Sequence, residues 1–230
     1  MTTTSSTRET TMKKATTTRS GEAEIVRQYG AEAIGDGRVH GVTFDGKLVW
    51  FARDDELVAF DPVAEKVVRR LSVPARAGTA FDGNHLYQLA QGEIFVIEPS
   101  DGRVVRKMPA PGKGADSGMA WADGYLWIGE YRAAKIHQVD AKTGEVVKTL
   151  SSDRFVTGVS VVDGAVWHGV SDDGPAELRR LASDGTVEEA FVVKGASHVA
   201  GVESDGKGAF WCGGEDGTLR LVRPKARKAG

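Results

Sequence analysis

The chain has 230 residues, a formal net charge of −2 and 40% hydrophobic residues, which suits one all-β domain of this length. Its near-neutral charge argues against a dedicated nucleic-acid binder, and no apolar run approaches the roughly 18 residues of a membrane-spanning helix. The single cysteine, Cys212, excludes a disulfide within the chain and fits a reducing compartment, so we expect a cytoplasmic protein.

The first segment, residues 1–21, is rich in Thr and Ser and carries basic residues such as Arg8, Lys13 and Lys14. It lacks the apolar stretch of a secretory signal, and the composition predicts a disordered leader. A transit peptide is the alternative, because acidic residues are scarce there. We expect the folded domain over 22–224 and a solubilising basic tail over 225–230.

One unit recurs five times after the leader, and each copy begins with an anchor glycine followed closely by a turn containing Asp-Gly. The anchors lie 37, 40, 40 and 43 residues apart, and an aromatic residue follows each of them by nine or ten positions. The anchor glycines are Gly41, Gly78, Gly118, Gly158 and Gly201, and the aromatics are Trp50, Tyr87, Trp127, Trp167 and Trp211. Four of the five tryptophans share this position, which indicates a structural repeat with these rings packed between the units.

Each Asp-Gly turn lies between two short apolar segments, which is a hairpin signal, and a second turn with a β-branched strand follows in most units. Units of about 40 residues with four antiparallel strands are typical of propeller blades. The sequence therefore predicts an all-β, five-bladed β-propeller with four-stranded blades. The last unit lacks its fourth strand, and Glu24–Tyr29 is expected to supply it, which would close the ring and remove an open edge.

Strand direction predicts which loops share a face. The loops that precede the anchor glycines and those that follow the second strand of each unit should surround one mouth of the central channel. The Asp-Gly turns should lie on the opposite face. The candidate site residues at this mouth are His40, His168, Asp116 and Cys212 for catalysis, with Arg38, Arg76, Ser117, Glu130, Tyr131 and His198 for substrate binding.

A histidine titrates near neutral pH, so His40, His168 and His198 could act as general acids and bases or hold a metal as neutral imidazoles. With Asp116 and Glu130 nearby, a divalent metal ion is one cofactor considered, although the sequence does not identify one. The alternative is that these histidines are loop residues of separate blades. The other histidines, His85 and His137, fall on strands and are expected to be structural.

Cys212 could act as a nucleophile if its pKa were lowered and a base such as His168 lay beside it. The alternative is a small buried apolar residue in a strand. No Walker loop, dinucleotide fingerprint or Cys-x-x-Cys or His-Glu-x-x-His zinc motif occurs, so the NTPase and oxidoreductase classes have no support.

The units at 78–109 and 118–151 resemble the plant-type glutaminyl cyclase (glutamine cyclotransferase) family of five-bladed propellers. The residues that carry the resemblance are the stretch Gly78-Thr79-Ala80-Phe81-Asp82-Gly83-Asn84-His85-Leu86-Tyr87-Gln88-Leu89 and the later Val104-Val105-Arg106-Lys107. The stretch Leu126-Trp127-Ile128-Gly129-Glu130-Tyr131 is similar, less specifically, to blades of the streptogramin (virginiamycin B) lyase family.

The resemblance implies a propeller enzyme, but the cyclase family places Gln and then Glu before its first two anchor glycines, where this chain has His40 and Ala77. The sequence thus favours an enzyme that acts on a small polar molecule by lyase- or cyclotransferase-like acid–base chemistry. A non-catalytic scaffold that binds a ligand or protein is the alternative. We expect a monomer with no nucleic-acid or membrane partner.

Overall fold

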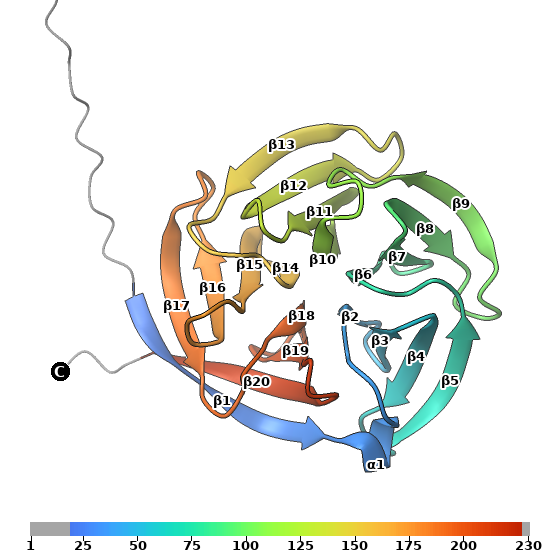
Figure 1. Ribbon diagram of the computed structural model, residues 1–230, viewed down its shortest axis with the longest axis horizontal. Helices are drawn as coiled ribbons and strands as arrows, with labels where there is room; N and C mark the ends of the chain where they lie inside the picture. The colour runs from blue at the N-terminus through green and yellow to red at the C-terminus, as the bar shows by residue number, and fades with distance from the viewer. Residues whose placement is uncertain (1–18, 227–230) are drawn as a thin grey trace, which may run out of the picture.

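The computed structural model describes residues 19–226, and in this range the chain forms twenty strands, β1 to β20, and one short helix, α1 (Ala31–Ile34). The strands form a ring of sheets around a central axis, and each sheet runs from the axis to the rim (Figure 1). This is the all-β architecture that the repeat predicts.

The strands occupy four positions from the axis outward. The innermost are β2 (Val42–Phe44), β6 (Thr79–Phe81), β10 (Asp116–Ala122), β14 (Val159–Val162) and β18 (Ala200–Ser204). The second are β3 (Val49–Arg53), β7 (Leu86–Ala90), β11 (Tyr125–Glu130), β15 (Ala165–Val170) and β19 (Phe210–Gly213). The third are β4 (Glu56–Asp61), β8 (Glu93–Ile97), β12 (Lys135–Asp140), β16 (Glu177–Leu181) and β20 (Leu219–Ala226). The outermost are β5 (Lys66–Ser72), β9 (Val104–Pro109), β13 (Val146–Ser151), β17 (Val187–Val193) and β1 (Arg19–Tyr29).

Three sheets have four strands each, whereas the remaining eight strands form one sheet in the order β14-β15-β16-β17-β1-β20-β19-β18. The prediction of separate four-stranded blades is therefore wrong for this part of the ring. The cause is β1, which pairs in parallel with β17 over Arg19–Ala23 and antiparallel with β20 from Gly21 to Tyr29. The strand that precedes the first unit thus completes the last unit, as predicted, and also joins it to its neighbour.

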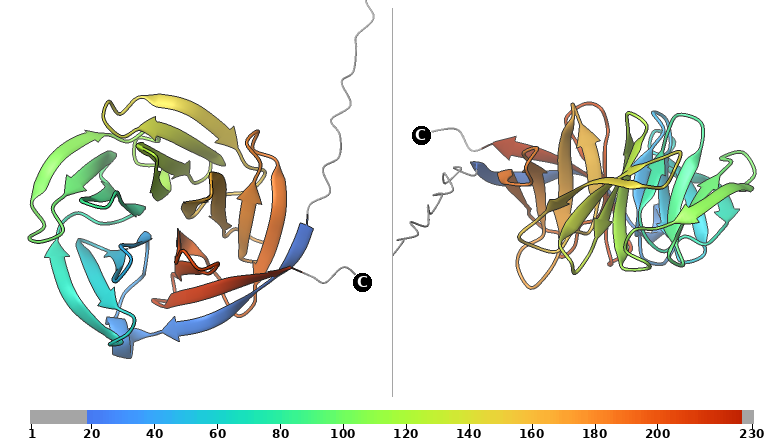
Figure 2. Two further views of the ribbon diagram at one scale, coloured as in Figure 1. Left: turned by 180° about the vertical axis from the view of Figure 1, so that it is seen from behind. Right: turned by 90° about the horizontal axis from the view of Figure 1, so that it is seen from above.

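The predicted ends of the domain need correction. β1 begins at Arg19, inside the expected leader 1–21, because residues 19–21 already pair with β17. β20 runs to Ala226, so the first residues of the expected tail 225–230 belong to a strand, and Lys225 forms an ion pair with Glu24. Figure 2 shows β1 and the end of β20 together at the outer edge of the disc. The rest of the predicted leader, residues 1–18, and of the predicted tail, residues 227–230, lies outside the described residues.

The five anchor glycines form a closed ring around the axis. A Cβ atom on Gly41 would come closer than 3.0 Å to the backbone around Gly78, and the same holds from Gly78 to Gly118 and onward through Gly158 and Gly201 back to Gly41. Real Cβ atoms essentially never approach other atoms so closely. The repeat therefore needs glycine at this position because neighbouring innermost strands touch backbone to backbone.

The repeated aromatics are mostly buried between neighbouring units, as the sequence predicts. Trp50 and Tyr87 are 2% and 5% exposed, and each donates a hydrogen bond to the aspartate of its own turn, Asp45 at 2.8 Å and Asp82 at 3.0 Å. The same two carboxylates accept backbone N–H groups within their turns. The turn aspartates are thus structural, which leaves the opposite face for function.

Candidate functional site

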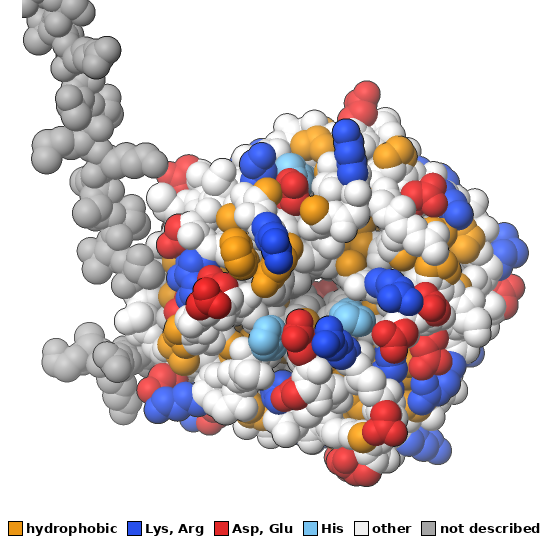
Figure 3. Space-filling model, viewed as in Figure 1, with side chains coloured by type: hydrophobic (Ala, Val, Ile, Leu, Met, Phe, Trp, Pro, Cys, Tyr) orange, Lys and Arg blue, Asp and Glu red, His pale blue; other side chains and the backbone are white. Residues whose placement is uncertain are grey.

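His40 and His198 lie at the channel mouth in loops that lead into neighbouring innermost strands, β2 and β18. The ring contact between Gly201 and the backbone carbonyl of His40 joins the two loops. On the face shown in Figure 3, two histidine side chains flank acidic and basic side chains beside the central depression. Residues from opposite ends of the chain therefore meet at one side of the mouth, because closure of the ring makes the first and last units neighbours.

The His40 imidazole is half-buried, and its burial lowers the pKa below the usual 6.5. The charges that act on the ring are, in order of effect, Asp54 (raising), Arg38 (lowering), Glu215 (raising) and Arg76 (lowering). A lowered pKa keeps the imidazole neutral at neutral pH, and a neutral imidazole can accept a proton. His40 therefore has the state that a general base needs.

His198 and Glu215 form a pair, with 3.9 Å between His198 Nε2 and Glu215 Oε2. Both side chains are partly exposed, at 37% and 51%, so they are open to solvent and to a ligand. Glu215 follows strand β19 and also acts on His40, which makes its carboxylate the group shared by both histidines. Glu215 was not among the predicted site residues, although it lies in a loop that follows the second strand of its unit.

The two predicted anion-binding arginines, Arg38 and Arg76, are both exposed and both act on the His40 ring. Arg76 forms a solvent-exposed ion pair with Asp55 at 3.2 Å, and such pairs hold their partners weakly. Arg76 also lines a cavity of about 290 Å³ together with Lys113 and Asp116. The mouth thus has cationic groups that an incoming anion can recruit.

His168 was predicted to be catalytic, and the structure removes it from the mouth. It is 0% exposed, and its two ring nitrogens lie 3.1 Å from the Gly169 carbonyl oxygen and 3.4 Å from Ser152 Oγ. Burial lowers the pKa of its imidazole to about 4. The prediction failed because strand residues alternate between faces, and His168 points into the packing between units instead of into the channel.

Cys212 is likewise 1% exposed, and its thiol donates only a long hydrogen bond, 3.8 Å, to the Phe210 carbonyl. Burial raises the pKa of the thiol to about 12, so the thiolate needed of a nucleophile does not form at neutral pH. The catalytic prediction for Cys212 is wrong, and the alternative of a small buried core residue describes it.

Asp116 and Ser117 have structural roles, because both side chains form hydrogen bonds with backbone groups. The Asp116 carboxylate accepts the backbone N–H groups of Gly112 at 2.8 Å and Gly114 at 3.1 Å, which shapes the loop before β10. Ser117 Oγ donates to the Val156 carbonyl at 2.6 Å. Asp116 therefore does not orient His40 as a catalytic partner, although it lines the same cavity as Arg76.

Glu130 and Tyr131 lie on another part of the rim. Glu130 is 3.1 Å from His137 Nε2, and Tyr131 donates to the Ser171 carbonyl at 3.2 Å and packs against Phe155. Among the described residues, no three His, Cys, Asp or Glu side chains converge as a metal site would require. The expected convergence of His40, His168 and His198 with Asp116 and Glu130 is thus reduced to His40 and His198 with Glu215.

Glu203 is an ionisable residue with a shifted pKa that was not among the predicted site residues. It lies on β18, and its carboxylate accepts hydrogen bonds from Thr43 Oγ1 at 3.1 Å on β2 and from Ser160 Oγ at 3.0 Å on β14. These strands flank β18 on its two sides, so the carboxylate lies on the channel axis. Its withdrawal from water raises its pKa to about 7, with the two hydroxyls and the Ser204 N–H opposing that shift.

We expect Glu203→Gln to change the pH dependence of stability. Below pH 4.5 the carboxyl is protonated in both the folded and unfolded states and has no effect. Between pH 4.5 and 7 the unfolded state loses its proton first, so the native protein loses stability as pH rises. The variant, which carries no such charge, should gain about 2–3 kcal/mol relative to wild type between pH 4.5 and 8. Urea unfolding at a series of pH values measures this, with the surface variant Glu93→Gln as the control.

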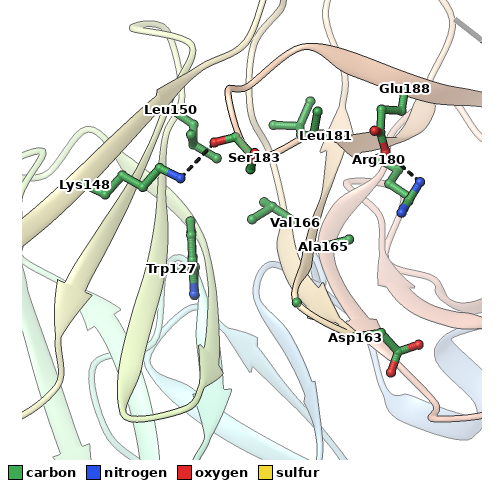
Figure 4. A pocket seen from close by; sticks show the side chains of 12 residues that line it. Trp127, Lys148, Leu150, Asp163, Ala165, Val166, Arg180, Leu181, Ser183 and Glu188 are labelled. Carbon is green, nitrogen blue, oxygen red and sulfur yellow. Dashed lines mark hydrogen bonds and ion pairs between the residues drawn. The ribbon is translucent and has the colours of Figure 1, made fainter.

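A second cavity of about 270 Å³ lies between two neighbouring units (Figure 4). Strands β11 and β13 of one unit and strands β15, β16 and β17 of the next contribute lining residues, together with the Asp163–Gly164 turn. It is lined by Trp127 together with apolar and charged side chains, and it shares no residue with the cavity beside Arg76. These two cavities are therefore separate, and the first is lined by Arg76, one of the charged groups that act on His40.

Comparisons with known proteins show which folds this architecture resembles. No family model and no curated protein matches the sequence. The structure is similar to that of Myxococcus xanthus glutaminyl cyclase, with a TM-score of 0.76 and 15% identity over 92% of this chain and 100% of that chain. It is also similar to the WD40 β-propeller domain of Doa1, with a TM-score of 0.55 and 15% identity over 82% of this chain and 63% of that chain.

No helix among the described residues is long and apolar enough to cross a membrane. Identity of 15% shows a shared fold and leaves activity open. The ring of radial sheets and the two structural likenesses together make this chain a β-propeller.

Proposed function

We propose that the protein is a five-bladed propeller enzyme that performs acid–base chemistry on a small polar, anionic molecule at the channel mouth. The five-blade count treats the eight-stranded sheet as two blades joined by β1, and the closed ring of five anchor glycines supports it. The likeness to a glutaminyl cyclase supports cyclotransferase-type chemistry as the first class to test.

The observation that carries the proposal is the meeting of His40 with the His198–Glu215 pair. His40 is half-buried with a lowered pKa, while the pair beside it remains open to solvent. Two titratable groups held in different environments at one place are what proton transfer to and from a substrate requires. The Glu203 carboxylate lies deeper on the axis and has no role in the proposed reaction.

Each residue then has a role. The neutral His40 imidazole removes a proton from the substrate, and His198, held by Glu215, returns a proton to the leaving group. Arg38 and Arg76 bind an anionic group of the substrate, and the cavity beside Arg76 accommodates part of its body. His40, His198 and Glu215 thus take the roles for which the sequence favoured His168 and Asp116.

We expect His40→Asn to lower kcat/KM by about 10²–10⁴-fold, because it removes the base. In the wild-type protein, kcat/KM should fall on acidification as His40 becomes protonated, with an apparent pKa below 6.5. A peptide with an N-terminal glutamine is the first substrate to assay, followed by a panel of small carboxylates.

His85→Gln is the matched control, because His85 lies in a turn on the opposite face beside Asp82 and should leave turnover unchanged. If His40→Asn retains full turnover of a substrate, His40 is not the base. If no panel member is turned over while one of them binds at the mouth, the protein is a binding scaffold, and the enzymatic proposal fails.

A further inference from the structure

The five contacts between neighbouring units share one arrangement. The repeated aromatic of one unit faces a residue pair on the first two strands of the next unit. The pair that faces Trp50 is Phe81 with Leu86, the pair that faces Tyr87 is Trp121 with Leu126, the pair that faces Trp127 is Val161 with Val166, the pair that faces Trp167 is Ser204 with Phe210, and the pair that faces Trp211 is Phe44 with Val49. Four of these pairs contain an aromatic ring.

The contact at Trp127 is the exception. Val161 and Val166 stand where the other pairs include a ring, and Val166 lines a groove beside Trp127. Trp127 is half-exposed, and among the described residues no other aromatic ring contacts its indole. Trp127 and Val166 thus face each other across a groove of about 270 Å³.

The groove is lined by both apolar and charged side chains. Trp127 and Leu150 lie on one side of the groove, and Ala165, Val166 and Leu181 lie on the other (Figure 4). An apolar cavity of about 150 Å³ can bind benzene, so the space is sufficient for an aromatic ring with a short substituent.

The two cationic side chains at the edge of the groove differ in their partners. Arg180 is bound to Glu188 at 2.7 Å, so these two neutralise each other. Lys148 Nζ donates to the Ser183 carbonyl at 2.8 Å, which is a neutral partner. The Asp163 carboxylate points away from Trp127 in Figure 4. The groove thus presents one available cation beside an indole face.

We propose that this groove, which we call the Trp127 groove, binds a small aromatic carboxylate. The ring lies in the groove against the Trp127 indole, and the carboxylate reaches Lys148. Stacking of two rings with an offset is favourable beyond the buried area alone, and the ammonium adds a charge-assisted hydrogen bond. This site is independent of the histidine site, with which it shares no residue.

The test uses the full chain and 3-phenylpropionate as the probe, followed through the indole N–H signals in ¹H–¹⁵N NMR spectra. Trp127→Phe identifies the Trp127 signal. In the wild type, this signal should shift saturably with a Kd on the order of 1 mM, a modest affinity for so small a ligand. The other indole signals should stay in place. An unmoved Trp127 signal, or equal shifts of all the indole signals, would overturn the proposal.

Two variants separate the ring from the charge. Val166→Phe places a ring on a residue that lines the groove and should abolish the shift of the Trp127 signal. Lys148→Met should weaken phenylpropionate about threefold while leaving the uncharged analogue 3-phenylpropanol unchanged, and Lys107→Met, on the outer strand β9, should change neither. Unaltered affinity in folded Val166→Phe would overturn the proposal. If that variant does not fold, equal weakening of both probes by Lys148→Met, or no weakening of either, would overturn it instead.

Discussion

A chain that begins at residue 30 is expected to lose the cooperative fold altogether. It lacks β1, which is the outermost strand of the last unit and pairs with both β17 and β20. Its removal would expose two strand edges at once and strip Ala23 and Tyr29 from the core. Open edges invite aggregation, and the loss of a whole strand exceeds the usual 5–15 kcal/mol of stability roughly available to a domain.

The matched control is a chain that begins at residue 19, which keeps all of β1. Circular dichroism and urea unfolding should show a cooperative transition for this shorter deletion at the wild-type midpoint, and none for the longer one. A chain that begins at residue 30 and still unfolds cooperatively near the wild-type midpoint would mean that β1 does not close the ring.

The second large effect is expected at the glycine ring. Gly118→Ala places a Cβ closer than 3.0 Å to the backbone of Gly158 and Val159, which cannot move aside like a side chain. Overpacking of this kind typically costs about 1–3 kcal/mol, and we expect the upper end or more because both partners are backbone.

Gly164→Ala supplies the comparison for Gly118→Ala. Gly164 lies in a hairpin turn with φ of +75° and nothing within 4 Å of its Cβ position, so its cost of about 1 kcal/mol comes from backbone conformation alone. Urea midpoints rank the two variants. If Gly118→Ala were as stable as Gly164→Ala or more so, the close contact of the innermost strands would not be real.

Most of the fold could be predicted because the five units have the same structural requirements at the same positions. Each unit needs a glycine where innermost strands touch, an Asp-Gly turn, and an aromatic such as Trp50 between units. The eight-stranded sheet could not be predicted, because the parallel pairing of Arg19–Ala23 with β17 leaves no mark in the local sequence. Only the length of β1, which extends into the Thr- and Ser-rich segment, produces it.

The site was predicted less well, because the sequence tells which loop a residue occupies but not where its side chain points. His40 and His198 were found, since both sit in the loops that precede anchor glycines. His168 and Cys212 were misplaced, because both lie on second strands whose side chains alternate between the channel side and the packed faces.

One available signal would have revealed Glu203. The second position after the anchor glycine holds a small uncharged residue in the other four units, namely Thr43, Ala80, Ala120 and Ser160. A glutamate in this series breaks the rule of the repeat, and the structure shows the consequence, a carboxylate on the axis held by two of these neighbours.

The most direct test of the histidine site is the titration of His40 by NMR in three proteins. We predict a pKa below 6.5 in the wild type, because burial disfavours the charged imidazole. Glu215→Gln should lower this pKa further, since it removes a stabilising negative charge, and Arg38→Gln should raise it, since it removes an opposing positive charge. A His40 that titrates at 6.5 or above, or that responds to neither substitution, would show that these groups do not form one site.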